Sequence, residues 1–212
     1  EVPCYLYPNC DAGVPGGTFS LDGDGLPTQS GTYTANFNCM IPRRSVDAPT
    51  AQPSRPSLYG HGLLGSAGET TSSPQRTLGN AHGFVFCGTD EIGLSGADVP
   101  VAITVLGEMG KFPQIGDRLQ QGLLNELFLG RLMIHPQGFA SDGAFREDGT
   151  LATDPVIDPS RLYYNGNSQG AIMGGALTAI APDFTRASLG VGGMNYSVLL
   201  NRSVDFDQYA QI

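Results

Sequence analysis

Residues 166–170 constrain the fold of this chain more than any other segment. They read Gly-Asn-Ser-Gln-Gly and stand between an apolar run, 162–164, and a run of small and apolar residues, 171–177. A G-x-S-x-G sequence between a strand and a helix forms a sharp turn, which holds its serine in a strained conformation and exposes the hydroxyl. We therefore expect a strand, a tight turn with Ser168 at its tip, and a helix.

Two flanking features strengthen this interpretation of the turn. Gly166 and Gly170 leave room for a sharp change of direction. Glycines inside a helix cost roughly 0.5–1 kcal/mol each relative to alanine, so Gly174 and Gly175 indicate that the helix must pack closely on the sheet. The alternative is a glycine-rich turn in which Ser168 is merely structural.

Hydrophobic patterning predicts strands that alternate with helices. The expected strands are 32–41, 57–59, 84–87, 161–165 and 187–192. Apolar residues at helical spacing from Ile115 to Met133 predict a largely buried helix. Further helices are expected within 66–83 and over 168–181. This alternation indicates an α/β fold with a mostly parallel sheet.

The remaining segments contain turn-forming residues. Residues 1–31 are rich in Gly, Pro and Asp, and are expected to form an irregular N-terminal extension before the main domain, 32–212. Residues 42–56 read as an exposed loop. Residues 137–160 contain Asp-Gly and Asp-Pro pairs and predict a turn-rich excursion with a hairpin.

The composition narrows the class of function. The 212 residues include 11 Lys+Arg and 20 Asp+Glu, which give a net charge of −9. Nucleic-acid binding is disfavoured, because it requires a basic surface. No run approaches the roughly 18 to 20 apolar residues of a membrane span. Glu1 stands where an initiator methionine is expected, which indicates removal of a leader; the alternative is a start chosen for expression.

Four cysteines suggest disulfides. Their even number, without CxxC or CxH spacing, favours bridges over a zinc site. Three pairings are possible, and we favour Cys4–Cys10 with Cys39–Cys87. Disulfides imply an oxidising compartment, hence a secreted or periplasmic protein. The alternative is buried free thiols in a reducing compartment.

A second catalytic signal lies upstream, in residues 59–65 (Tyr-Gly-His-Gly-Leu-Leu-Gly), directly after an expected strand. Acyl transfer places negative charge on a carbonyl oxygen, and each backbone N–H aimed at it contributes about 3–4 kcal/mol. The N–H of Gln169, at the start of the helix, is one expected donor. Leu63 is the second, with Leu64 as the alternative.

With residues 61–65 and 166–170 in the same strand and helix order, the chain resembles the α/β-hydrolase superfamily, and within it secreted lipases and esterases, over roughly residues 32–200. The resemblance implies that His61, followed by Gly62, anchors the oxyanion loop and is not a base. It also implies the strand order 1-2-4-3-5-6-7-8. Cys39 in strand 2 and Cys87 in strand 4 would then be neighbours, which supports their pairing.

The chain departs from that family after the serine. The family order is Ser, then an acid, then His, but no histidine follows Ser168, and the acids there are Asp183, Asp205 and Asp207. The upstream histidines, His61, His82 and His135, are expected to be structural. A serine without a base is a poor nucleophile.

We therefore expect the N-terminal portion of an incomplete α/β-hydrolase domain, completed by a second polypeptide that carries the catalytic histidine and the acid. The predicted activity is hydrolysis of carboxylic esters, with lipid or polyester substrates possible, through an acyl-enzyme on Ser168. The alternative is a non-catalytic binding or structural subunit that retains the scaffold. No cofactor is expected, although Asp22 and Asp24 resemble the start of a calcium loop that lacks its later ligands.

Overall fold

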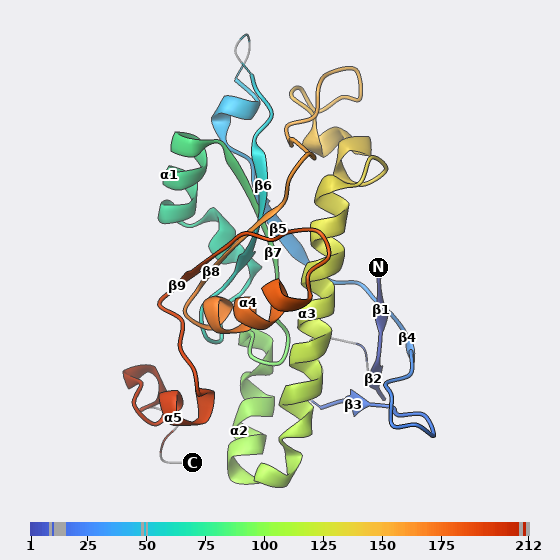
Figure 1. The fold of residues 1–212 in the computed structure, drawn as a ribbon, viewed down its shortest axis with the longest axis vertical. Helices are drawn as coiled ribbons and strands as arrows, with labels where there is room; N and C mark the ends of the chain where they lie inside the picture. Colours follow the sequence, from blue (N-terminus) through green and yellow to red (C-terminus); the bar gives the residue numbers. More distant parts are fainter. Residues whose placement is uncertain (9, 11–15, 48, 50, 208–209, 211–212) are drawn as a thin grey trace.

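The centre of the molecule is a five-stranded sheet with the order β5-β7-β6-β8-β9 (Figure 1). The computed structural model describes residues 1–8, 10, 16–47, 49, 51–207 and 210. The strands are β5 (Phe37–Met40), β6 (Arg55–Gly60), β7 (Phe84–Thr89), β8 (Tyr163–Asn167) and β9 (Ala187–Gly190). β6, β7, β8 and β9 run parallel, whereas β5 is antiparallel to β7. The predicted α/β class with a mostly parallel sheet is confirmed.

Helices pack against both faces of this sheet (Figure 1). The helices of the described residues are α1 (Ser73–His82), α2 (Val99–Gly107), α3 (Pro113–Ile134), α4 (Gln169–Ile180) and the short α5 (Tyr196–Leu200), and those that contact the sheet are α1, α3 and α4. α1 contacts β5 and β7, while α3 contacts β6 and β7 and α4 contacts β6, β8 and β9. The connection from β7 to β8 contains both α2 and α3, and α2 had no counterpart among the expected elements.

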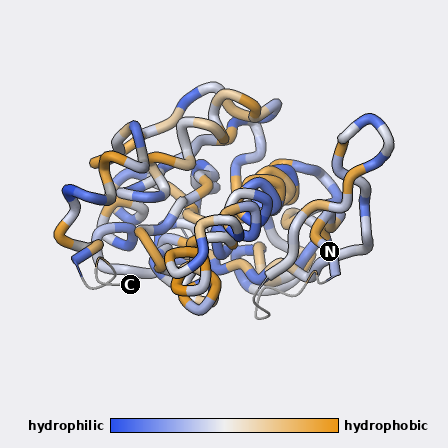
Figure 2. Tube along the Cα trace, turned by 90° about the horizontal axis from the view of Figure 1, so that it is seen from below, coloured by the Kyte–Doolittle hydropathy of each residue, from blue (hydrophilic) through white to orange (hydrophobic). Residues whose placement is uncertain are grey.

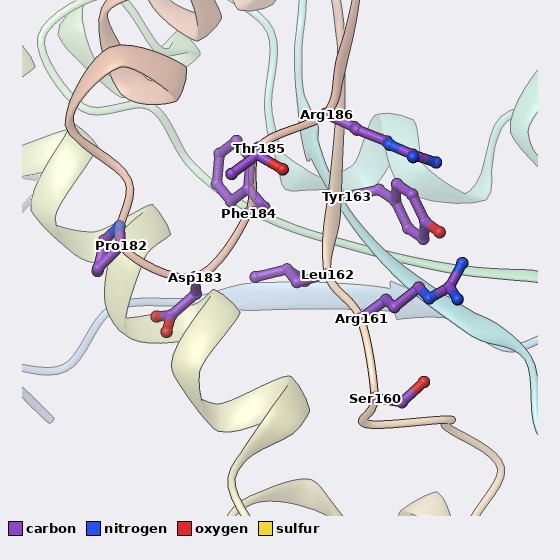
Figure 3. Close-up of a pocket in the computed structure, with 9 residues that line it drawn as sticks. All are labelled: Ser160, Arg161, Leu162, Tyr163, Pro182, Asp183, Phe184, Thr185 and Arg186. Carbon is purple, nitrogen blue, oxygen red and sulfur yellow. The ribbon is translucent and has the colours of Figure 1, made fainter.

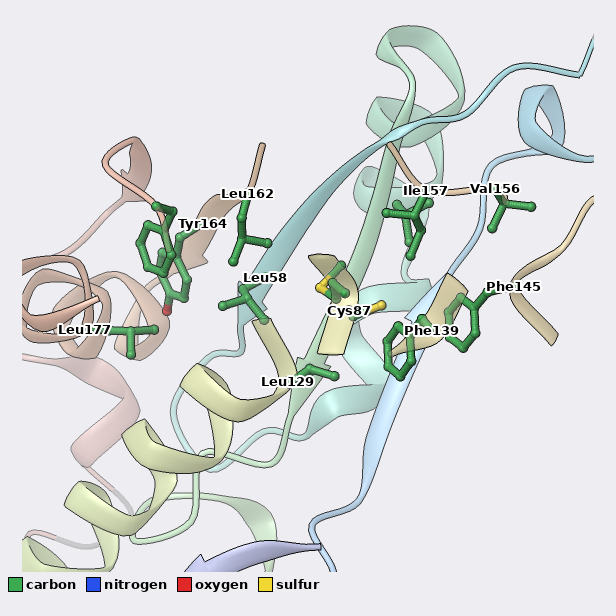
Figure 4. Close-up of a cluster of buried hydrophobic side chains, with 13 residues drawn as sticks. Leu58, Cys87, Leu129, Phe139, Phe145, Val156, Ile157, Leu162, Tyr164 and Leu177 are labelled. Carbon is green, nitrogen blue, oxygen red and sulfur yellow. The ribbon is translucent and has the colours of Figure 1, made fainter. Parts of the chain in front are cut away.

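The main hydrophobic core lies between the sheet and the α3–α4 layer (Figure 4). Alternate residues of the strands point into it, as the period of two requires. Its fully buried members include Leu58 from β6, Val85 and Cys87 from β7, and Leu177 from α4. Phe139 and Phe145, from the segment after α3, stack on each other with ring centroids 4.0 Å apart and close one end of the core.

The long helix is present as predicted, but its most buried face differs from the apolar one. Leu129 and Met133 enter the core, while the apolar Phe128 and Leu132 are more than a third exposed. The polar residues Arg118, Gln121, Asn125 and Glu126 are buried instead. They are covered because the end of β7 and the N-terminal segment both lie along α3, which the periodicity of the helix alone does not reveal.

The N-terminal extension is more ordered than expected. Its described residues contain β1 (Val2–Cys4), β2 (Leu6–Tyr7) and β3 (Thr18–Phe19), and β1 pairs with β4 (Gly31–Tyr33) while β2 pairs with β3. The extension is fastened to α3, because Gln121 accepts a hydrogen bond from the N–H of Tyr5 at 3.0 Å and donates one to the carbonyl of Pro3. The single strand expected over 32–41 is divided in the structure into β4, which pairs with β1, and β5, which joins the central sheet.

The segment after α3 contains no hairpin of paired strands within the described residues. Two short 3₁₀ turns, Phe139–Ser141 and Gly143–Phe145, and a single bridge between Arg146 and Pro155 replace it. Asp142 and Asp148 accept hydrogen bonds from backbone N–H groups two residues later, as turn-forming aspartates do. Turn chemistry was therefore predicted correctly, but the strand pairing was not.

Both predicted disulfides are present. Cys4 is bonded to Cys10 and Cys39 to Cys87. Cys39 and Cys87 face each other across the antiparallel pair β5–β7, with Cα atoms 4.1 Å apart.

Hydrophobic and hydrophilic stretches alternate along the chain (Figure 2), and no described helix has the length and apolarity needed to cross a membrane.

Loss of the Cys39–Cys87 bridge should destabilise the protein more than loss of Cys4–Cys10. The two bridges span sequence separations of 48 and 6 residues. Loop-closure entropy then predicts losses of about 4 and about 2 kcal/mol, respectively. Urea unfolding of the two double cysteine-to-alanine variants measures this difference; equal losses would show that chain entropy is not the main contribution.

Candidate active site

Ser168 lies at the junction of β8 and α4, at the carboxyl end of the parallel strands. We call this turn, residues 166–170, the elbow. Its backbone angles are φ 56° and ψ −115°, a region that residues with side chains avoid. Its N–H donates to the carbonyl of Gly190 at 2.9 Å, which ties the turn to the end of β9. The side chain is half-buried, and its hydroxyl has no hydrogen-bond partner among the described residues.

Three glycines allow the turn to pack against the end of β6. A Cβ atom on Gly170 would overlap the backbone of Gly60, and one on Gly166 would overlap the carbonyl group of Gly170. On Gly60 a Cβ atom would lie 2.8 Å from the Cα of Gly170. These positions therefore exclude any side chain for steric reasons.

The two glycines inside α4 have different roles. A Cβ atom on Gly174 would overlap the ring of Tyr164 and lie 2.9 Å from Leu189, so this position requires close packing on the sheet. Gly175 is exposed, and a Cβ atom there would have no neighbour within 4 Å among the described residues. The expectation of close packing therefore does not apply to Gly175, which faces outward.

His61 anchors the loop that follows β6. It is fully buried, its Nδ1 lies 2.7 Å from the carbonyl oxygen of Gly62, and its Nε2 accepts the N–H of Glu91 at 2.9 Å. A carbonyl only accepts hydrogen bonds, so Nδ1 carries the proton and Nε2 does not. Both ring nitrogens are thus engaged in fixing the loop.

The loop 61–65 is braced on its other side by Glu69 and Leu94. The N–H of Gly62 lies 3.1 Å from the nearer carboxylate oxygen of Glu69. The N–H of Leu64 donates to the carbonyl of Leu94 at 3.0 Å, and Leu64 has a positive φ of 53°. Because this N–H is already engaged, Leu64 does not serve as the alternative oxyanion donor.

Two expected donors remain available. The N–H groups of Leu63 and Gln169 have no partner among the described residues. The start of α4 is held against the start of the loop, because the N–H of Gly170 donates to the carbonyl of His61 at 2.8 Å. The first turn of α4 and the start of the loop 61–65 are therefore in direct contact.

A buried carboxyl group that no sequence pattern revealed lies beneath this junction. Glu91 is 3% exposed, and its Oε2 accepts from the side-chain amide of Gln169 at 3.4 Å. The hydroxyl of Tyr164 lies 2.5 Å from the carbonyl oxygen of Gly170 and 3.3 Å from Oε1 of Glu91. The hydroxyl of Tyr164 has one proton, which it donates to the closer acceptor, the carbonyl oxygen of Gly170. The longer contact, with Oε1 of Glu91, is a hydrogen bond if Glu91 carries the proton. Burial raises the pKa of Glu91, in agreement with this neutral form.

A second buried acid, Glu126 on α3, holds the end of β7. Its Oε1 accepts from the N–H of Thr89 at 2.8 Å and from the hydroxyl of Thr89 at 3.1 Å, whereas its Oε2 has no partner among the described residues. Burial raises the pKa of Glu126 from its usual 4.5 to about 8, and the hydrogen bonds from Thr89 only partly oppose this. Glu126 is therefore neutral below about pH 8.

Two of the three histidines, His82 and His135, lie at the opposite end of the sheet from Ser168, and His61 has both ring nitrogens engaged. His82 ends α1, before β7, and is thus at the amino end of the parallel strands. His135 follows α3, whose Gly130 packs near Leu162 at the start of β8, so it also lies at that end. His61 is held in the loop by both of its ring nitrogens.

Asp183 and Asp90 each make a structural contact. Asp183 forms an ion pair with Arg131 at 2.8 Å, remote from Ser168. Asp90, adjacent to Glu91, accepts the N–H of Ala67 at 2.8 Å. Asp207 is exposed, and the side chain of Asp205 lies outside the described residues.

The proposed calcium ligands are engaged in a turn. Oδ1 of Asp22 accepts from the N–H groups of Asp24 and Leu26, both at 2.9 Å. Among the described residues, no group of three acidic, histidine or cysteine side chains is arranged to hold a metal ion.

Comparison with known proteins does not assign the chain to a family. No family model matches the sequence, and no curated protein shows significant similarity to it. The geometry of the site is therefore the basis for a functional assignment.

Substitution of Gly170 by alanine should strongly destabilise the protein, whereas the same change at Gly175 should not. The methyl group at position 170 would meet backbone atoms that cannot move independently. At Gly175 it meets open space, and alanine should stabilise the helix by about 0.5–1 kcal/mol. Thermal unfolding of both variants provides the measurement, and a tolerated Gly170→Ala would refute the close contact with Gly60.

Replacement of Glu126 by glutamine should change the dependence of stability on pH. The folded state keeps the carboxyl proton up to about pH 8, whereas the unfolded state releases it near pH 4.5. The folded protein therefore binds more protons, and this group lowers stability as pH rises through that interval. The melting temperature of Glu126→Gln minus that of the wild type should increase across the interval from 4.5 to about 8. A constant difference would show that Glu126 is ionised in the fold.

Proposed function

We propose that this chain is the nucleophile-bearing portion of a secreted or periplasmic serine hydrolase of carboxylic esters. The histidine base and the acid come from protein outside these 212 residues, since no histidine follows Ser168 within them. The observation that carries the proposal is the strained Ser168 at the start of α4, flanked by the N–H groups of Gln169 and Leu63, which have no partner in the described part of the chain.

The chemistry follows from these positions. The Ser168 hydroxyl attacks the ester carbonyl while the histidine from outside these residues accepts its proton. The N–H groups of Gln169 and Leu63 stabilise the developing oxyanion. The alcohol leaves with a proton from the histidine, and water then hydrolyses the acyl-enzyme. The half-buried Leu63 and Leu64 favour an apolar acyl chain, as in a lipid or polyester, over a charged substrate.

The sheet topology supports membership of the α/β-hydrolase superfamily. The order β5-β7-β6-β8-β9 corresponds to strands 2-4-3-5-6 of the order that the sequence resemblance implies. The positions of the two motifs along the chain also correspond. Ser168 follows β8, which matches strand 5 of that order, and the loop 61–65 follows β6, which matches strand 3. The two disulfides agree with an oxidising compartment.

The state of β9 supports the need for further protein at this edge of the sheet. Among the described residues β9 pairs only with β8, and Ala187, Ser188 and Leu189 are exposed. Its four residues include no proline and no charge, the features that usually protect an edge strand from further pairing. A further strand can extend the sheet at this edge, opposite the side on which β9 pairs with β8 and Gly190 accepts the N–H of Ser168.

Ser168 should react covalently with a fluorophosphonate probe in the native complex. Ser168→Ala should abolish labelling and lower hydrolysis of a p-nitrophenyl ester by at least about 10³-fold, as expected for loss of a nucleophile. Ser73→Ala, at an exposed position on α1, is the control and should retain both.

Absence of labelling in the native complex would refute the catalytic proposal. It would leave the alternative, a binding or structural subunit that retains the elbow without its chemistry. Labelling that persists in Ser168→Ala would equally exclude Ser168 as the nucleophile.

A further inference from the structure

Residues 91–98, between β7 and α2, hold the loop 61–65 through three hydrogen bonds, and we call this segment the brace. The three pairs are the N–H of Glu91 with Nε2 of His61 (2.9 Å), the N–H of Leu64 with the carbonyl of Leu94 (3.0 Å), and the N–H of Gly96 with the carbonyl of Gly65 (2.8 Å). They fix the loop on both sides of Leu63, whose N–H is an expected oxyanion donor. The conformation of the loop therefore depends on that of the brace.

Asp98 fixes the conformation of the brace. It is fully buried, and its Oδ2 accepts from the N–H of Gly93 at 2.7 Å, the N–H of Ser95 at 3.0 Å and the hydroxyl of Ser95 at 2.6 Å. One carboxylate oxygen thus closes the brace into a compact turn. Leu94 lies inside this turn, so the position of the carbonyl that receives the N–H of Leu64 depends on Asp98.

The other oxygen of Asp98 is paired with Arg118 on α3. Oδ1 accepts from Nε of Arg118 at 2.8 Å and lies 2.6 Å from its Nη2, and the two side chains are 0% and 1% exposed. Further along α3, Leu129 and Met133 are buried in the main hydrophobic core. The ion pair therefore connects the brace to the most firmly packed part of the molecule.

The brace also packs directly on α3 and on the N-terminal extension. Gly93 has a positive φ of 109°, and a Cβ atom there would lie 2.7 Å from the backbone nitrogen of Leu119. Ile92 is 1% exposed and is buried in a cluster with side chains of the N-terminal extension. The brace is thus held between these two elements, on the side away from the loop 61–65.

We propose that Asp98 is a positioning residue of the oxyanion site. The proposal rests on the serine hydrolase proposed above. Asp98, held by Arg118, fixes the brace, and the brace fixes the loop that carries the N–H of Leu63. Donors that are already in place need not reorient as charge develops on the substrate oxygen. A displacement on the order of 1 Å can lower the rate by about a hundredfold.

Two double variants separate the hydrogen-bond acceptor from the charges of the pair. Asp98→Ala/Arg118→Met removes the acceptor. Asp98→Asn/Arg118→Gln keeps it, because the asparagine oxygen can still accept from the N–H groups of the brace. Oε1 of the new glutamine then takes the place of the arginine Nε and accepts from the asparagine amide. Both charges are removed together, so neither variant leaves an uncompensated charge in the interior.

In the complete native protein, Asp98→Ala/Arg118→Met should lower kcat for a p-nitrophenyl ester by about tenfold to a hundredfold, because a displaced donor no longer stabilises the transition state. KM should change little, since this interaction forms only as the oxyanion develops. Asp98→Asn/Arg118→Gln should retain most of the wild-type kcat. A purely structural role of the ion pair predicts no such separation between the two variants.

A transition-state mimic provides a second readout. In a trifluoromethyl ketone the carbonyl carbon bonds reversibly to the Ser168 oxygen, the serine proton passes to the base, and the carbonyl oxygen becomes an oxyanion in the same site. Affinity for this ketone should fall in parallel with kcat in Asp98→Ala/Arg118→Met. Affinity for the corresponding methyl ketone, which does not add to the serine, should change little.

The ion pair between Arg131 and Asp183 is the matched control. It also joins α3 to another segment, with an N–O distance of 2.8 Å. Asp183 borders a hollow at the amino ends of β8 and β9, at the opposite end of the sheet from Ser168 (Figure 3). Arg131→Met/Asp183→Ala should therefore leave kcat, KM and the affinity for the trifluoromethyl ketone unchanged.

Hydrogen exchange measures the loop without relying on activity. The Leu64 amide should exchange faster in Asp98→Ala/Arg118→Met than in the wild type or in the control, because its acceptor is no longer fixed. Circular dichroism and thermal unfolding establish that each variant is folded. If this variant is not folded, Ser95→Ala replaces it, since it removes one donor to Asp98 and leaves the ion pair intact; it should change kcat and exchange in the same directions.

Several results would overturn the proposal. These are an unchanged kcat in the folded variant that lacks the acceptor, an equal loss in the Arg131 and Asp183 control, or a loss that the asparagine and glutamine pair does not restore. Fluorophosphonate labelling of Ser168 is measured in the same samples. Labelling with unchanged kcat and exchange refutes the positioning role alone. Absence of labelling in the wild type refutes the hydrolase, and faster exchange at Leu64 would then still show that Asp98 holds the loop.

Discussion

The direct contact between the backbones of Gly170 and Gly60 determines the geometry of the whole site. It brings the first turn of α4 against the end of β6, where the N–H of Gly170 binds the carbonyl of His61. The position of the Gln169 N–H relative to the loop 61–65 follows from this contact. A side chain at either glycine would separate the first turn of α4 from the end of β6.

Buried polar groups hold this contact in place from below. Tyr164 binds the Gly170 carbonyl, and Glu91 supports Tyr164 and Gln169 while its backbone N–H fixes the ring of His61. One acid thus connects the elbow, the oxyanion loop and the core strand β8. Burial raises the pKa of this carboxyl group, while the hydrogen bonds with Gln169 and Tyr164 oppose that rise.

Local patterns in the sequence predicted those parts of the structure that local physics determines. The elbow, the long helix and the parallel strands follow from glycine spacing and hydrophobic periodicity. The pairing of Cys39 with Cys87 was supported by the strand order that the family resemblance implies, and the bridge is present. Gly175 shows the limit of such reasoning, because a glycine at a helix position does not reveal which side it faces. Glu91 was missed because a single acid after a strand looks like a loop residue until Tyr164 and Gln169 surround it.

Tertiary contacts account for most of the other differences. The polar side chains of α3 are buried because Thr89, Tyr5 and Pro3 approach them from segments far away in the sequence. The N-terminal segment is held by the same contacts, in addition to the pairing of β1 with β4 and of β2 with β3. Neither effect has a signature in the periodicity of the segment concerned.

The edge strand β9 links the nucleophile to the edge at which a further strand can pair. Its last residue, Gly190, accepts the N–H of Ser168, and the next residue, Val191, has a positive φ of 49°. Two strained residues therefore lie at the carboxyl ends of β8 and β9. Such conformations persist only where the surroundings determine them strongly, yet β9 is exposed on one side. A partner that pairs with β9 and covers its face would hold Gly190, and through it the Ser168 backbone, in the geometry needed for attack. Pairing at this edge would then contribute to catalysis by stabilising the strained turn.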